Sequence, residues 1–183
     1  MKLWNGFAFK SSDFVTSGVP VIRIGDLQGG HVTIAGAACV TEEVAKFIGN
    51  SFWIPEGSLL LAMSGATTGK TAFNTTGKRL LLNQRVGRIE PFHVCIGFIK
   101  IFFETIIARN LSISFGTAIP NLSAQQINET VIPIPPLAEQ HRIVTMVDGL
   151  IGLCDELEDS LIAVDSARSN VLDSILHHAL QPV

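Results

Sequence analysis

Cysteines are few in this sequence, and none are paired by spacing. The 183 residues include Cys39, Cys95 and Cys154, which lie far apart and form no C-x-x-C motif. A zinc cluster or a disulfide framework needs closely spaced or evenly paired cysteines, so buried reduced thiols are the simpler interpretation. The five histidines also lack a metal-ligand spacing such as H-E-x-x-H. We therefore predict no metal site in this chain.

Long apolar runs are missing too. Residues 1–10 contain no apolar segment of the kind found in signal peptides. The longest apolar stretch, 94–108, includes Lys100 and Glu104 and is too short and too charged to span a bilayer. The sequence therefore predicts a cytoplasmic protein without a membrane partner.

No complete catalytic motif is present, although residues 64–71 (SGATTGKT) resemble a phosphate-binding Walker loop. That loop requires glycine where this chain has Ser64, and the residues after Thr71 favour a strand instead of the required helix. A nucleotide hydrolase is therefore disfavoured. A small-residue loop with a lysine still suits phosphate contact on DNA, and a plain hairpin loop is the alternative. Serine-nucleophile and methyltransferase motifs are also missing, so we predict no catalytic residue and no cofactor in this chain.

The composition favours a folded core, because 47% of the residues are hydrophobic and only 16% are charged. Up to Pro135 and Pro136, short β-prone runs alternate with turn residues, which predicts a mixed α/β globular domain over 1–136 with a twisted, irregular sheet. The predicted elements are strands at 19–24, 58–63 and 80–89, helices at 41–47 and 94–108, and one further turn capped by Ser123.

After Pro136 the pattern changes to a heptad repeat over 137–183. Apolar residues advance in alternating steps of four and three, interrupted by Arg168 and ending at His178. No proline occurs between Leu137 and Gln181, so we predict one long coiled-coil helix of roughly 60 Å that needs a partner helix. Its predicted dimerisation residues are Ile143, Val147, Leu150, Cys154, Leu157, Leu161, Val164, Val171 and Ile175.

Charge is unevenly distributed between these two parts. Residues 1–135 carry 11 basic and 8 acidic side chains, whereas residues 136–183 carry 2 and 8. The formal net charge of −3 therefore combines a globule of +3 with a helix of −6. Between Glu56 and Glu90 there is no acidic residue, although five basic residues lie in that stretch. A basic patch of this kind suits phosphate binding by the globule.

Seven segments recur in this chain in an order that is typical of one known family. They are NGFAFKSSDF (5–14), VIRIGDL (21–27), MSGATTGK (63–70), LNQRV (82–86), GTAIPNLS (116–123), IPPLAEQ (134–140) and VDGLIGLCDELE (147–158). Together they resemble the specificity subunit of type I restriction-modification enzymes, and the resemblance covers essentially the whole chain. Its most specific part is the ending, a Pro-Pro-Leu-x-Glu-Gln motif followed by Leu-Cys-Asp-x-Leu-Glu.

This resemblance implies a target recognition domain at 1–136 followed by one conserved helix at 137–183. In the family, such a domain reads one half of a split sequence in double-stranded DNA. The long helices set the spacing between two domains and dock methyltransferase (modification) subunits. Those subunits carry the adenine methylation that uses S-adenosylmethionine, and a separate restriction or motor subunit cuts DNA with ATP and magnesium.

The chain differs from a full specificity subunit in having one recognition domain and one helix instead of two of each. It also begins at Met1 without the short segment that usually precedes the Asn-Gly motif. A half-subunit, a truncated product and a fragment of the second half are all compatible with this pattern. We expect two copies to form a homodimer through antiparallel helices.

The leading hypothesis is sequence-specific DNA recognition without catalysis. The alternative is a coiled-coil protein-interaction module with no DNA role, and the acid-free stretch argues against it.

For each individual residue, a solvated surface charge or a turn position remains an equally good interpretation, and Arg85, expected inside a strand, could instead be an ion-pair partner. The predicted DNA-binding residues are Lys10, Ser11, Ser12, Arg23, Ser64, Thr67, Thr68, Lys70, Lys78, Arg79, Asn83, Gln84 and Arg85.

Overall fold

The computed structural model describes residues 1–65, 68–113 and 122–179, and it describes side chains for 1–65, 68–107 and 122–177. The chain divides into two compact units, Met1–Gln140 and His141–Val183. Thr67 and most of the 116–123 motif lie outside the described residues. The predicted mixed α/β class with a long C-terminal helix is confirmed.

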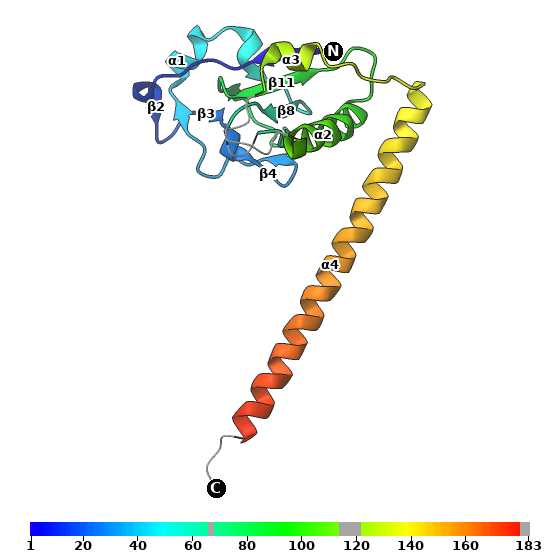
Figure 1. Ribbon diagram of the computed structural model, residues 1–183. Helices are drawn as coiled ribbons and strands as arrows, with labels where there is room; N and C mark the ends of the chain where they lie inside the picture. The colour runs from blue at the N-terminus through cyan, green and yellow to red at the C-terminus, as the bar shows by residue number, and fades with distance from the viewer. Residues whose placement is uncertain (66–67, 114–121, 180–183) are drawn as a thin grey trace. The chain divides into compact units, whose positions relative to one another are not determined.

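The described strands form two sheets instead of the single sheet that the sequence predicted. One sheet has the order β1-β11-β8-β9-β5-β4 and the other β2-β6-β3-β10-β7. Figure 1 labels β4, β8 and β11 of the first sheet and β2 and β3 of the second. Neighbouring strands are antiparallel, except that β3 pairs with β10 and β5 with β9 in parallel. The strands are β1 Lys2–Asn5, β2 Phe14–Val15, β3 Val19–Ile22, β4 Leu27–Gln28, β5 His31–Val32, β6 Cys39–Val40, β7 Trp53–Ile54, β8 Leu59–Ala62, β9 Thr71–Phe73, β10 Leu80–Leu82 and β11 Val86–Glu90.

Helices α1, α2 and α3 pack on the outer faces of the sheets. Helix α2 packs on the first sheet together with α3, and α1 packs on the second. No helix in the described residues is long and apolar enough to cross a membrane. The helices are α1 Glu42–Phe47, α2 Ile96–Ile113, α3 Ala124–Asn128 and α4 Leu137–Ala179, and the 3-10 turns are η1 Ser11–Asp13, η2 Ile24–Asp26 and η3 Asn50–Phe52.

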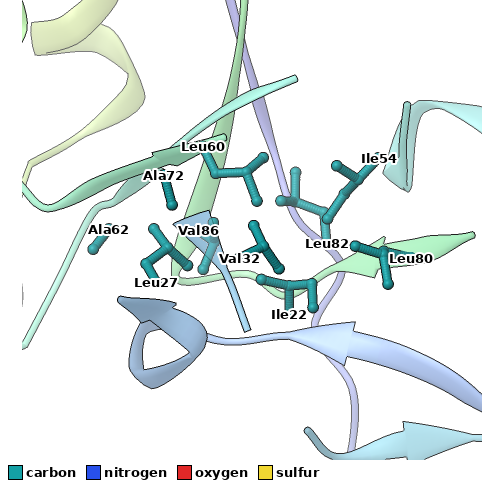
Figure 2. Packing of buried hydrophobic residues seen from close by; sticks show 10 residues of the cluster. All are labelled: Ile22, Leu27, Val32, Ile54, Leu60, Ala62, Ala72, Leu80, Leu82 and Val86. Atoms are coloured by element: carbon teal, nitrogen blue, oxygen red, sulfur yellow. The ribbon is translucent and has the colours of Figure 1, made fainter. Parts of the chain in front are cut away.

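The central core lies between the two sheets. Ten buried residues from eight strands or strand ends meet there, and Figure 2 shows their side chains converging. Strand β8 is buried on both faces, because Leu60 and Ala62 point into this core while Leu59 and Leu61 point towards α2. This two-sided burial explains why β8 is a continuous apolar run instead of an alternating one.

Local capping and turn signals gave correct predictions. The Thr41 hydroxyl accepts a hydrogen bond from the Val44 amide at 3.3 Å and so caps α1. The pKa of Glu43 in the first turn is lowered because its carboxylate accepts hydrogen bonds, first from its own backbone amide and then from Thr41. The Ser123 hydroxyl likewise accepts from the Gln126 amide at 3.1 Å and caps α3.

The predicted strand at 80–89 is wrong in one respect, because the chain turns in its middle. Strand β10 belongs to the second sheet and β11 to the first, so the chain crosses between sheets at residues 83–85. The Asn83 side-chain oxygen accepts a hydrogen bond from the Arg85 amide at 3.3 Å and supports this turn. Arg85 therefore lies in an exposed turn and not inside a strand.

Gln140 anchors the first turns of α4 within the globular unit. Its side chain is 1% exposed. The carboxamide oxygen accepts from the Cys95 amide at 2.8 Å, and the nitrogen donates to the Pro135 carbonyl at 2.8 Å. One buried side chain thus ties the segment before α2 to the extended residues before α4, which gives the Gln of the Pro-Pro-Leu-x-Glu-Gln motif a structural role.

We expect Gln140→Ala to destabilise the globular unit by about 2–3 kcal/mol, because it leaves a buried N–H and a buried carbonyl without partners. Thermal unfolding should then shift down by roughly 5–10 °C. Gln125→Ala is the matched control, since Gln125 lies on the exposed surface of α3 and bonds only to Glu129 among the described residues. Equal melting temperatures for the two variants would contradict the anchoring role.

Candidate nucleic-acid interface

Six of the predicted DNA-binding residues lie at one end of the two sheets, where several strands terminate. The Asn83 amide donates to the Ile22 carbonyl at 3.2 Å, which places the end of β10 beside the end of β3. The Met63 amide donates to the Arg85 carbonyl at 2.9 Å, which places the 83–85 turn beside the end of β8. We call this set the basic rim; its members are Arg23, Ser64, Lys70, Asn83, Gln84 and Arg85.

The loop between β8 and β9 belongs to the basic rim. The Gly69 amide donates to the Ala62 carbonyl at 2.8 Å, and the Ala62 amide donates to the Lys70 carbonyl at 2.9 Å, so the hairpin pairing extends up to Lys70. Strand β9 follows directly at Thr71. The segment that resembled a Walker loop is therefore a hairpin loop without the following helix that such a loop requires.

The N-terminal Asn-Gly-Phe segment closes the other side of the 83–85 turn. The Phe7 amide donates to the Leu82 carbonyl at 2.7 Å, and the Gln84 amide donates to the Phe7 carbonyl at 2.9 Å. A Cβ atom on Gly6 would lie 2.0 Å from the Asn83 carbonyl oxygen. Only glycine permits this close backbone approach, so the Asn-Gly motif serves to fix the turn that carries Gln84 and Arg85.

Arg23, Lys70 and Arg85 are exposed, and none of them forms an ion pair with any described acidic side chain. The nearby Asp26 carboxylate accepts a hydrogen bond from the Arg23 backbone amide at 2.8 Å. Gln84 is exposed as well. The basic rim therefore offers three positive charges that have no acidic partner among the described residues, together with an amide that can both donate and accept.

Two of the predicted polar contacts are used within the fold. Thr68 is 8% exposed, and its hydroxyl donates to the Gly65 carbonyl at 2.7 Å. Asn83 is 9% exposed and supports the turn described above. These two side chains shape the basic rim, which leaves Ser64 and Gln84 as its more accessible uncharged polar groups.

Other predicted residues lie elsewhere. Lys78 and Arg79 precede β10 and so lie at the opposite end of that strand from Asn83. Lys10 lines a surface depression with Phe47 of α1, and Ser11 and Ser12 form the η1 turn next to it. The described residues among the predicted DNA contacts thus lie in three places on the globule.

The prediction missed both tryptophans. The Arg79 guanidinium lies 4.3 Å from the centroid of the Trp53 ring. Trp4 contacts Lys2 at 3.6 Å and Arg88 at 5.6 Å in the same way, and its ring nitrogen donates to the Glu90 carboxylate at 2.6 Å. The partners are 26 or more residues apart in the pairs Trp53–Arg79 and Trp4–Arg88, so no local sequence signal could have found them.

Seven of the nine predicted dimerisation residues of α4 are exposed, and Ile143 and Val147 are half-buried. Leu150, Leu157, Leu161 and Val164 are 57–67% exposed, and Cys154 is exposed as well. The helix spans 43 residues, or about 65 Å. Among the described residues, no group of three His, Cys, Asp or Glu side chains is placed to hold a metal ion.

Known proteins with similar sequences are specificity subunits. The type I restriction enzyme EcoBI specificity subunit of Escherichia coli is 29% identical over 191 residues, covering 96% of this chain and 36% of that protein. The EcoAI specificity subunit of Escherichia coli is 23% identical, covering 96% of this chain and 31% of that protein. The chain thus spans about a third of the length of these relatives. Their names agree with the prediction that this chain carries no catalytic centre.

Solved structures show the same fold. A chain from a structure of a type I R-M system superposes with a TM-score of 0.76 at 17% identity, covering 97% of this chain and 42% of that chain. The HsdS subunit from Thermoanaerobacter tengcongensis gives a TM-score of 0.64 at 17% identity, covering 87% of this chain and 37% of that chain. A sequence model described as "Type I restriction modification DNA specificity domain" matches residues 2–164. The chain therefore belongs to the type I restriction modification DNA specificity domain family.

Proposed function

We propose that residues 1–136 form a target recognition domain that binds one half of a bipartite double-stranded DNA sequence without catalysing a reaction. The basic rim carries this proposal, because exposed cations without acidic partners neutralise phosphates and an exposed glutamine can pair with base edges. The rim also combines strand ends from both sheets, so its side chains stand on a rigid support. The family description as a DNA specificity domain supports this choice over a protein-interaction module with no DNA role.

The chemistry of the system then belongs to partner subunits. Modification subunits supply adenine methylation with S-adenosylmethionine, and a restriction subunit supplies ATP- and magnesium-dependent cleavage. Helix α4 provides their docking surface, and its acidic character keeps it away from DNA. The chain thus acts in the cytoplasm as the recognition element of a larger assembly.

A second copy of this chain is the proposed partner for the exposed seam of α4. The leucines of this seam are more than half exposed in the single chain. Burying them between two copies favours association by about 25 cal/mol per Å² of apolar surface removed from water. An antiparallel pair related by a two-fold axis at residue 159 matches all ten seam positions. These pairs are Ile143 with Ile175, Val147 with Val171, Leu150 with Arg168, Cys154 with Val164, and Leu157 with Leu161.

Arg168 decides between antiparallel and parallel pairing. In a parallel pair each seam residue faces its own copy, so two Arg168 guanidinium groups would meet in an apolar seam. In the antiparallel pair each Arg168 lies against Leu150, and the two guanidinium groups are separated by about 27 Å along the axis. Antiparallel pairing therefore avoids the repulsion.

Replacing Arg23, Lys70 and Arg85 together by glutamine should weaken DNA binding by roughly 100-fold, because three phosphate-neutralising charges are lost. The slope of log affinity against log salt should fall by about 3. The measurement is a fluorescence-anisotropy titration with a duplex selected by the unaltered chain from a random pool. The single variant Arg85→Gln removes one exposed cation of the basic rim. Its matched control is Lys46→Gln, which removes one exposed cation on α1. A triple variant with unchanged affinity and slope would refute the role of the basic rim.

Val164→Cys should allow an intermolecular disulfide with Cys154 under mild oxidation, because antiparallel pairing places these two positions opposite each other. The unaltered chain should give no disulfide-linked dimer through Cys154, since its two copies would lie about 15 Å apart along the axis. Non-reducing electrophoresis measures both outcomes.

Adding Cys154→Ser to Val164→Cys is the control and should abolish the cross-link. A Cys154–Cys154 disulfide in the unaltered chain would indicate parallel pairing instead. Light scattering at tens of micromolar tests the association itself, and a strictly monomeric mass would contradict the homodimer.

A further inference from the structure

The Arg79 guanidinium is stacked on an aromatic ring. Its central carbon lies 4.3 Å from the centroid of Trp53, on the neighbouring strand β7. Leu80 pairs with Ile54 and Leu81 with Trp53, so this strand pairing brings the two side chains onto the same face of the sheet. Trp53 is half-buried and Arg79 is exposed. A stacked guanidinium is fixed in its plane while its N–H groups remain free at the edges.

The loop that carries Arg79 is held in one conformation by hydrogen bonds. Asn74 is fully buried, and its side-chain nitrogen donates to the Pro55 carbonyl at 3.1 Å. Its side-chain oxygen accepts from the Thr76 hydroxyl at 2.8 Å. The Gly77 amide donates to the Glu56 carboxylate at 2.9 Å, which ties the loop to the turn before β8. Arg79 therefore follows a loop that hydrogen bonds hold in place, and its guanidinium is stacked on the Trp53 ring.

No described side chain uses the hydrogen-bonding edges of Arg79. It makes no ion pair with a described acidic residue, although Glu56 lines the same surface cavity of about 480 Å³. Lys78 also lines that cavity and is exposed. The result is an oriented, unpaired guanidinium beside a second positive charge.

This site is separate from the basic rim. Arg79 and Asn83 flank β10 on opposite sides, about 13 Å apart at the rise of a strand. The basic rim therefore does not explain why Arg79 is oriented and unpaired.

We infer that Arg79, positioned by Trp53, binds a pair of acceptor atoms on DNA in a bidentate manner and forms a second contact outside the basic rim. The inference rests on the proposed DNA-binding function. Two acceptor pairs on DNA have the required geometry, the O6 and N7 atoms of a guanine and two oxygens of one phosphate. Trp53 is a positioning residue, because it acts on the DNA through Arg79.

A double-mutant cycle tests this inference with the 183-residue chain and its selected duplex. Arg79→Lys keeps the charge but loses the planar fork, so affinity should fall roughly tenfold. Trp53→Leu should cause a similar loss, and the double variant should be no worse than about twofold below either single variant. Trp53→Phe should retain most of the affinity, because a ring face remains for stacking.

Lys46→Arg is the matched control, since Lys46 is an exposed cation on α1 that belongs neither to the basic rim nor to the cavity beside Arg79, and the change should leave affinity within about twofold. Melting temperatures separate a folding defect from a binding defect in the tryptophan variants. Arg79→Lys with unchanged affinity would overturn the bidentate contact. If the fold-losses in DNA affinity of Trp53→Leu and Arg79→Lys multiply in the double variant, the two residues act independently. That result would overturn the positioning role of Trp53.

Selection by the Arg79→Lys variant distinguishes the two sources of acceptors. A guanine edge predicts a relaxed preference at one guanine of the selected site, whereas a phosphate predicts equal weakening on all duplexes. Either result supports the bidentate contact. If the unaltered chain selects no duplex at all, the proposed function fails together with this inference. If it selects one and Arg79→Lys changes nothing, this inference alone fails.

Discussion

The crossing of the chain between its two sheets at residues 83–85 is the constraint on which the candidate interface depends. Strands β10 and β11 lie in different sheets, so the backbone must leave one and enter the other within three residues. The Asn83 amide donates to the Ile22 carbonyl and the Gln84 amide to the Phe7 carbonyl, while a Cβ atom on Gly6 would collide with the Asn83 carbonyl. The side chains of Gln84 and Arg85 are exposed, so they are accessible to DNA.

Charge differs sharply between the two parts of the chain. The globule has a net charge of +3 and the C-terminal helix a net charge of −6, so the total of −3 describes neither part. Several cations of the globule lack acidic partners among the described residues, which leaves their full charge for an external polyanion. Acidic residues on α4 would repel phosphates, so the apolar seam between them is suited to protein.

Patterns of local origin could be predicted from the sequence, whereas long-range contacts could not. Caps at Thr41 and Ser123 depend on residues three or four positions away, and the heptads of α4 depend on repetition alone. The break at Gln84 was missed because apolar residues on both sides suggested one strand, and only sheet membership separates them. Likewise, Arg79 was predicted from its charge, but its orientation comes from Trp53, which lies on another strand.

The long helix is the part of the chain whose folding is least supported from within. Among the described residues, no seam residue of α4 belongs to a hydrophobic core cluster, and Gly149 and Gly152 each cost about 1 kcal/mol relative to alanine. Isolated helices are marginal in water unless an apolar face is covered. In the proposed pairing, association buries this apolar seam, so the ordering of the helix would be thermodynamically coupled to the binding of its partner.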